Sequence, residues 1–114
     1  HDSTGAVVAP WPLPRTANVV GGLVSTVHEM FRYARSYWTP GALLSADSLA
    51  EMRNPVCPIG GPPGLGYPLF GESVGLSWFA SCLEGHRLIT HSGGTNGQLS
   101  RLLIAPEDRF AFGT

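Results

Sequence analysis

Lysine is absent from this chain: all seven basic residues are arginine, and the net charge is −1. The absence excludes a lysine general base or a Schiff-base amine within these 114 residues. A charge this close to zero, without a basic stripe or an acidic tail, argues against nucleic-acid binding, which depends on neutralising phosphates. No apolar run is long enough to cross a bilayer, so we expect no transmembrane segment.

Cysteine is scarce as well. Cys57 and Cys82 form no C-x-x-C pair, and we interpret them as two separate buried thiols rather than a disulfide or a metal site. We therefore expect no metal and no other cofactor. The polar start His1–Thr4 lacks the apolar core of a signal peptide, which leaves the localisation open. Because the first residue is not methionine and the last residues interrupt an apolar alternation, we expect a missing N-terminal part of the same polypeptide.

The first half of the chain is predicted to be helical after an irregular, proline-rich start. Thr26 and Glu29 have the spacing of a capping box, and apolar residues follow at helical spacing, which predicts a helix over residues 26–37. Ser45 is a suitable N-cap for a second helix over residues 46–53. Both helices precede the part of the chain in which the periodicity changes.

After a proline- and glycine-rich loop at residues 55–73, the apolar period changes from 3.6 to 2, which indicates strands. Pro106–Arg109 suits a four-residue hairpin loop. The predicted antiparallel strands are residues 74–80, 86–92, 98–105 and 109–113. Helices followed by such strands indicate an α+β fold. We divide this single partial domain into an irregular segment (1–20), a helical part (21–54), the loop (55–73) and the strands (74–114).

The tetrapeptide His91-Ser92-Gly93-Gly94 interrupts one of these strands. Glycine weakens a strand, so two glycines here indicate either a bulge or a close approach to the backbone. Taken alone, the pattern is more typical of a bulge or turn beside a structural histidine. Gly21-Gly22 similarly favours a role in backbone geometry at a helix start, with anion binding at the helix N-terminus as the alternative.

Four motifs occur in order: GGLVST, LLSADSLAEM, GLSW and HSGGTNGQLSRLLIAPE. Over about residues 20 to 114 the chain thereby resembles the C-terminal part of the serine β-lactamase-like, or penicillin-binding-protein-like, family. That family includes class C β-lactamases, DD-peptidases, D-aminopeptidases and related esterases, and many of its members are exported. In it, a strand beside the active site carries Lys-Thr-Gly or His-x-Gly, and the second form matches His91-Ser92-Gly93.

The resemblance implies a role for each residue of the tetrapeptide. The backbone N–H of Gly94 would be one donor of the oxyanion hole, and His91 would help to orient the substrate and the proton-transfer network. Ser92 and Gly93 would contact a small-molecule or peptide-like acyl substrate.

The family's nucleophile lies in Ser-x-x-Lys and its second motif is Tyr-x-Asn, and this chain contains neither. We therefore expect a fragment of a serine hydrolase that forms an acyl-enzyme with amide, β-lactam or ester carbonyls in the intact parent. The isolated chain is expected to be inactive. The alternatives are a non-catalytic binding or scaffold relative of the same fold and an unrelated α+β interaction domain.

Overall fold

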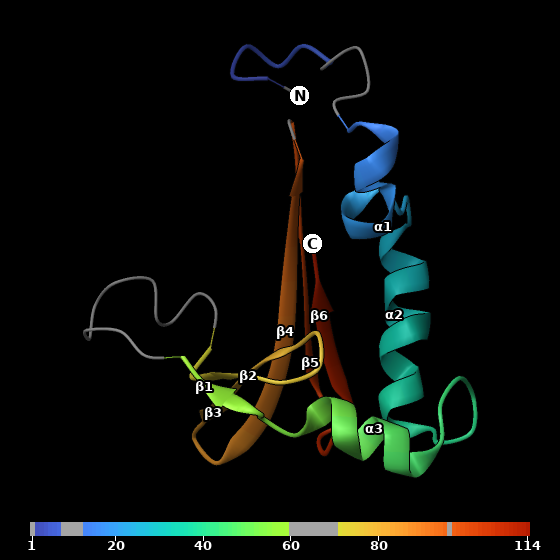
Figure 1. The fold of residues 1–114 in the computed structure, drawn as a ribbon, viewed down its shortest axis with the longest axis vertical. Coiled ribbons are helices and arrows are strands. Elements are labelled where there is room, and N and C mark those ends of the chain that lie inside the picture. Colours follow the sequence, from blue (N-terminus) through green and yellow to red (C-terminus); the bar gives the residue numbers. More distant parts are fainter. Residues whose placement is uncertain (1, 8–12, 60–70, 96) are drawn as a thin grey trace.

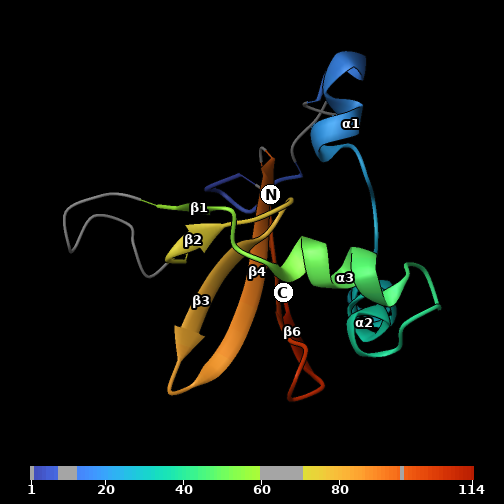
Figure 2. The ribbon, with the colours of Figure 1, turned by 60° about the horizontal axis from the view of Figure 1, so that its bottom comes forward.

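The computed structural model describes residues 2–7, 13–59, 71–95 and 97–114. Within them, helices lie on one side of a six-stranded antiparallel sheet with the strand order β1-β2-β3-β4-β5-β6 (Figures 1 and 2). The predicted α+β class is confirmed. The elements are η1 (Arg15–Ala17), α1 (Asn18–Gly21), α2 (Val27–Arg35), η2 (Ser36–Trp38), α3 (Ala46–Arg53), β1 (Cys57–Pro58), β2 (Ser73–Val74), β3 (Phe79–Leu83), β4 (His86–Thr95), β5 (Gln98–Ala105) and β6 (Phe110–Gly113).

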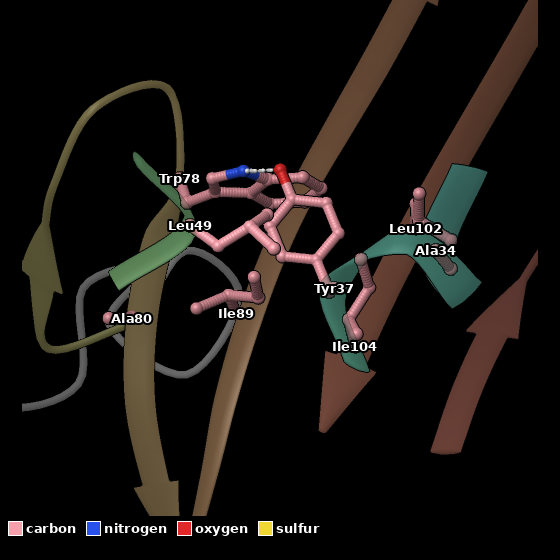
Figure 3. Packing of buried hydrophobic residues seen from close by; sticks show 8 residues of the cluster. All are labelled: Ala34, Tyr37, Leu49, Trp78, Ala80, Ile89, Leu102 and Ile104. Atoms are coloured by element: carbon pink, nitrogen blue, oxygen red, sulfur yellow. Dashed lines mark hydrogen bonds between the residues drawn. The ribbon is translucent and has the colours of Figure 1, made fainter. Parts of the chain in front are cut away.

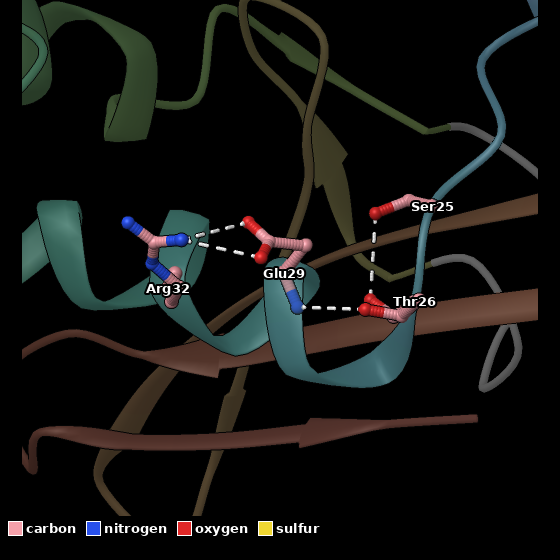
Figure 4. A network of polar contacts seen from close by, with 4 residues as sticks. All are labelled: Ser25, Thr26, Glu29 and Arg32. Carbon is pink, nitrogen blue, oxygen red and sulfur yellow. Dashed lines mark hydrogen bonds and ion pairs between the residues drawn. The ribbon is translucent and has the colours of Figure 1, made fainter.

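Both predicted helices begin at the expected caps. The hydroxyl of Thr26 accepts a hydrogen bond from the Glu29 N–H at 3.2 Å (Figure 4). The Glu29 carboxylate bonds Arg32 at 3.2 and 3.3 Å, so the capping-box spacing supplies an N-cap and a surface ion pair. At the start of α3, the Ser45 hydroxyl accepts from the Ser48 N–H at 3.1 Å. Local sequence therefore determines where these helices start.

The predicted strand over residues 74–80 is wrong, because the chain reverses inside it. The N–H of Gly75 donates to the carbonyl of Trp78 at 2.8 Å, and Ser77 has a φ of 68°. Val74 consequently ends β2 and pairs with Phe79, the first residue of β3. A tight hairpin can carry the same alternation of apolar and small residues as a strand, and here the turn prevails.

The predicted loop at residues 55–73 is also partly wrong. Its two ends pair as β1 and β2, with Cys57 opposite Val74 and Pro58 opposite Ser73, while residues 60–70 lie outside the described part of the chain. Cys57 and Cys82 are separate free thiols, but both are exposed rather than buried. Cys57 lies on the two-residue outer strand of the sheet, which leaves it open to solvent.

In the irregular segment predicted for residues 1–20, residues 1 and 8–12 lie outside the description. The end of that segment is already helical, as η1 and the start of α1. The predicted loop between the last two strands is confirmed: Ala105 and Phe110 pair on either side of it, and the Arg109 N–H donates to the Pro106 carbonyl at 3.3 Å.

A compact apolar cluster joins α2, η2 and α3 to the sheet (Figure 3). Ile89 of β4 and Ile104 of β5 are cross-strand partners, both fully buried. Burying such a side chain contributes about 1.5–3 kcal/mol. The cluster comprises Ala34, Tyr37, Leu49, Trp78, Ala80, Ile89, Leu102 and Ile104. It holds the first half of β4 firmly, and the second half, which carries the tetrapeptide, extends beyond it.

Candidate functional site

The tetrapeptide 91–94 lies in β4 where that strand loses one of its two neighbours. The pairing of β3 with β4 runs from Leu83 opposite His86 to Phe79 opposite Thr90 and ends there. The pairing of β4 with β5 continues to Thr95 opposite Gln98. Within the described residues, β4 is therefore an inner strand up to Thr90 and an edge strand from residue 91 onward.

The register decides which N–H groups point to this open edge. Glu84 and Gly85 form a two-residue turn with φ values of 51° and 89°, so the flanking residue His86 directs its N–H toward β3. In an antiparallel strand the direction alternates with each residue. The even-numbered residues of β4 therefore face the β3 side. Ser92 and Gly94 are even-numbered, so their N–H groups point outward where β3 has ended.

The two glycines are not a bulge or a turn. Each residue of β4 from Ile89 to Thr95 pairs with one residue of β5, without an insertion. Neither Gly93 nor Gly94 has a positive φ. A Cβ at Gly93 would lie 3.1 Å from the Ser100 hydroxyl, and one at Gly94 would lie 3.2 Å from the exposed end of Leu99. The glycines thus leave no side chain projecting from this exposed part of β4.

His91 and Ser92 lie on opposite faces of the sheet, because successive side chains of a strand alternate. The ring of His91 contacts Phe79 at a centroid distance of 5.9 Å and Trp78 at 6.5 Å. The hydroxyl of Ser92 shares the other face with Thr90. The structure therefore does not bring His91 and Ser92 together as a nucleophile and its base, although both border the same strand edge.

Arg101 is a charged neighbour that the sequence analysis did not identify. It is the cross-strand partner of Ser92, and its Nε donates to the Thr90 hydroxyl at 3.4 Å. The sequence contained the information needed to place Arg101. If Asn96-Gly97 is a two-residue hairpin loop, Thr95 lies opposite Gln98, and the same register three residues further along both strands places Arg101 opposite Ser92. A guanidinium is thus held on the same face as Ser92.

Tyr37 and Trp78 form a buried polar contact beneath this region. The indole N–H of Trp78 donates to the Tyr37 hydroxyl at 2.7 Å (Figure 3). The Tyr33 hydroxyl bonds the same Tyr37 hydroxyl at 3.0 Å. Burial, reinforced by the hydrogen bond with Tyr33, raises the pKa of Tyr37 well above its ordinary value. Tyr37 therefore stays neutral and serves as a hydrogen-bonding group rather than as a base.

Thr95, directly after the tetrapeptide, has a buried hydroxyl oxygen with no hydrogen-bond partner among the described residues. Such a group costs free energy and occurs where water or a ligand completes the bonding. Nowhere in the described ranges do three or more His, Cys, Asp or Glu side chains cluster as a metal site would require. The exposed contact of His86 with Asp108, at 2.9 Å, has no third ligand.

No helix in the described ranges combines the length and apolar character needed to cross a bilayer. Comparisons of the chain with protein-family models, with curated proteins and with solved structures found no match. We therefore infer function from the geometry of the β4 edge and from the four ordered motifs.

Proposed function

We propose that this chain forms one wall of the acyl-transfer site of a serine hydrolase related to the β-lactamases, with the Ser-x-x-Lys nucleophile supplied by residues outside these 114. One observation carries the proposal. Strand β4 becomes an edge strand at His91, and the two outward N–H groups that follow belong to Ser92 and Gly94. Gly94 is the residue that the family resemblance marks as an oxyanion donor.

In this mechanism an extended acyl substrate lies along the open edge as an additional strand. When the serine attacks the carbonyl carbon, the carbonyl π electrons move to the oxygen, and the Gly94 N–H donates a hydrogen bond to the resulting oxyanion. A donor in this position meets negative charge as it develops and typically lowers the barrier by about 2.7–4 kcal/mol. The absence of a side chain at Gly93 and Gly94 lets the substrate approach closely.

His91 and Ser92 act from the two faces of the same edge. The imidazole of His91 takes part in substrate orientation and proton transfer, while the Ser92 N–H anchors the substrate backbone. Arg101 adds positive charge on the Ser92 face, which favours a substrate carrying negative charge there. The supported substrate class remains amides, β-lactams or esters.

The first experiment uses the 114-residue chain. Incubated with a chromogenic β-lactam or a p-nitrophenyl ester, it is expected to show no burst and no covalent adduct, because Ser92 has no base in position to take its proton: across β5 it faces Arg101, and His91 lies on the opposite face. Mass spectrometry that detects an acyl group on Ser92 would contradict this assignment. The coding sequence next to these residues must also encode Ser-x-x-Lys and Tyr-x-Asn; without them, the non-catalytic alternative is favoured.

The second experiment places substitutions in a polypeptide that carries those motifs. Gly94→Pro removes the outward N–H and leaves the β4–β5 hydrogen bonds intact, because Pro is tolerated where an N–H faces solvent. We expect acylation to slow by about 10²–10³-fold. Gly94→Ala keeps the N–H and displaces only the exposed end of Leu99, so its effect should be small.

Gly93→Pro is the matched structural control. The N–H of Gly93 points toward β5, so a proline there breaks the strand ladder and should lower thermal stability more than Gly94→Pro does. If Gly94→Pro folds like the unmodified protein and also acylates like it, Gly94 is not an oxyanion donor and the proposal fails.

A further inference from the structure

The imidazole of His91 is exposed, yet two aromatic rings contact it: Trp78, directly before β3, and Phe79, the first residue of that strand. Trp78 meets it edge to face, with an interplanar angle of 86° and a centroid distance of 6.5 Å, and Phe79 lies at 5.9 Å with a tilt of 33°. Edge-to-face and offset arrangements at such centroid distances are favourable for aromatic rings. A free surface histidine would exchange among rotamers, whereas this one borders a fixed aromatic wall.

Trp78 is itself fixed by the core. It is only 5% exposed, and its indole packs edge to face on Tyr37 at 5.5 Å and 85°. The indole N–H can only donate, and the Tyr37 hydroxyl accepts it at 2.7 Å. Tyr37 is 1% exposed and is bonded in turn to Tyr33. The orientation of Trp78 is thus determined by both packing and a buried hydrogen bond.

We propose that Trp78, oriented by Tyr37, is a positioning residue for His91: it holds the imidazole at the open edge of β4 in one rotamer. The inference rests on the proposed function, in which His91 orients the substrate. It also explains why the chain reverses at residues 75–78 instead of continuing as a strand. The reversal makes Phe79 the first residue of β3, which leaves β4 without a β3 partner from His91 onward, and it places the indole beside His91.

NMR spectroscopy of the 114-residue chain tests this directly. The side chain of His91 should show scalar couplings of a single χ1 rotamer and slow ring reorientation in the unmodified protein. In Trp78→Leu, the couplings should become rotamer-averaged, and the His91 ring protons should move toward random-coil shifts. Tyr37→Phe keeps every ring but removes the acceptor of the indole N–H, so partial averaging is expected.

Tyr33→Phe is the control, because it leaves the bond between Trp78 and Tyr37 in place and should leave the His91 couplings unchanged. Backbone amide signals of Ile89 and Ile104 report whether each variant is folded. If Trp78→Leu does not fold, Tyr37→Phe and Trp78→Phe decide the question.

A folded variant that has lost the Trp78 indole, or its bond to Tyr37, but keeps a single His91 rotamer would overturn the proposal. This readout does not depend on catalysis. Failure of the acylation experiments with intact NMR effects would contradict the proposed function alone, whereas an unaltered His91 rotamer would contradict only the positioning role.

Discussion

Replacing Tyr37 with phenylalanine removes one oxygen atom from the centre of the buried cluster and leaves every ring in place. The edge-to-face contact between residues 37 and 78 survives, because it involves the rings alone. The lost atom is the acceptor, at 2.7 Å, of the Trp78 indole N–H. The substitution therefore tests one buried hydrogen bond with little change in packing volume.

The expected cost follows from the asymmetry of buried hydrogen bonds. A donor left without a partner in the interior pays its full desolvation penalty, about 1–3 kcal/mol. Trp78 is 5% exposed, so water does not readily replace the lost hydroxyl. We expect Tyr37→Phe to lower the free energy of unfolding by an amount in this range.

Urea denaturation followed by circular dichroism measures this change, and an unaltered slope against urea shows that the denatured state is comparable. Tyr33→Phe removes a hydroxyl from a residue that is 38% exposed and leaves the Trp78 bond intact, so it should cost less. A double-mutant cycle of Tyr37→Phe with Trp78→Phe isolates the coupling between the two groups.

The free energy of unfolding of Tyr37→Phe should also depend on pH differently from that of the unmodified protein. Because folding raises the pKa of Tyr37 above its ordinary value of 10.0, the unfolded chain ionises first. The contribution of the neutral Tyr37 hydroxyl to the free energy of unfolding is fully present below pH 10 and is lost as the pH rises further. The free energy of unfolding then falls by at most about 1.4 kcal/mol per pH unit. Tyr37→Phe should not show this part of the decrease in stability at high pH.

The stability advantage of the unmodified protein over the variant should therefore shrink above pH 10. If Tyr37→Phe is as stable as the unmodified protein at neutral pH and also loses stability equally at high pH, the buried hydrogen bond does not stabilise the fold. In that case the orientation of Trp78 depends on packing alone.

Two further substitutions test the core and the backbone. Ile104→Ala empties a fully buried position of β5 within the apolar cluster and should cost about 2–5 kcal/mol in urea denaturation, so a loss below about 1 kcal/mol would show that this cluster is not the centre of the core. Gly71→Ala should be much less stable than Gly85→Ala in thermal melts: both have a positive φ, but only at Gly71 would a Cβ clash, at 2.8 Å, with the Ala80 carbonyl. Equal losses would contradict this close approach.

Helix starts and the regular strands were predictable because their signals are local. A hydroxyl three residues before a free N–H caps a helix wherever the chain lies, as Thr26 and Ser45 show. The hairpin loop after Ala105 follows from its turn residues in the same way. The strand predicted over residues 74–80 failed because a period of two does not distinguish a strand from a short hairpin.

Tyr37 shows a second limit of prediction from local sequence patterns. It was not assigned to the apolar face of the first helix, although it lies three residues after Ala34 and seven after Met30, positions that share one helix face. The helical period thus places Tyr37 on the buried face, but it does not indicate that its hydroxyl accepts a hydrogen bond from Trp78. The two residues are 41 positions apart, so no local pattern could pair them.

The α+β order of elements and the helix caps follow from the amino-acid sequence alone, because they depend on neighbours along the chain, and so does the composition of the tetrapeptide at residues 91–94. The end of the β3–β4 pairing at Thr90, which makes the rest of β4 an edge strand, is a property of the folded chain. Strand pairing depends on where a distant segment turns, and here the reversal before Phe79 sets it. That single turn exposes the N–H groups of Ser92 and Gly94 and places Trp78 beside His91, and the roles proposed for these residues follow from it.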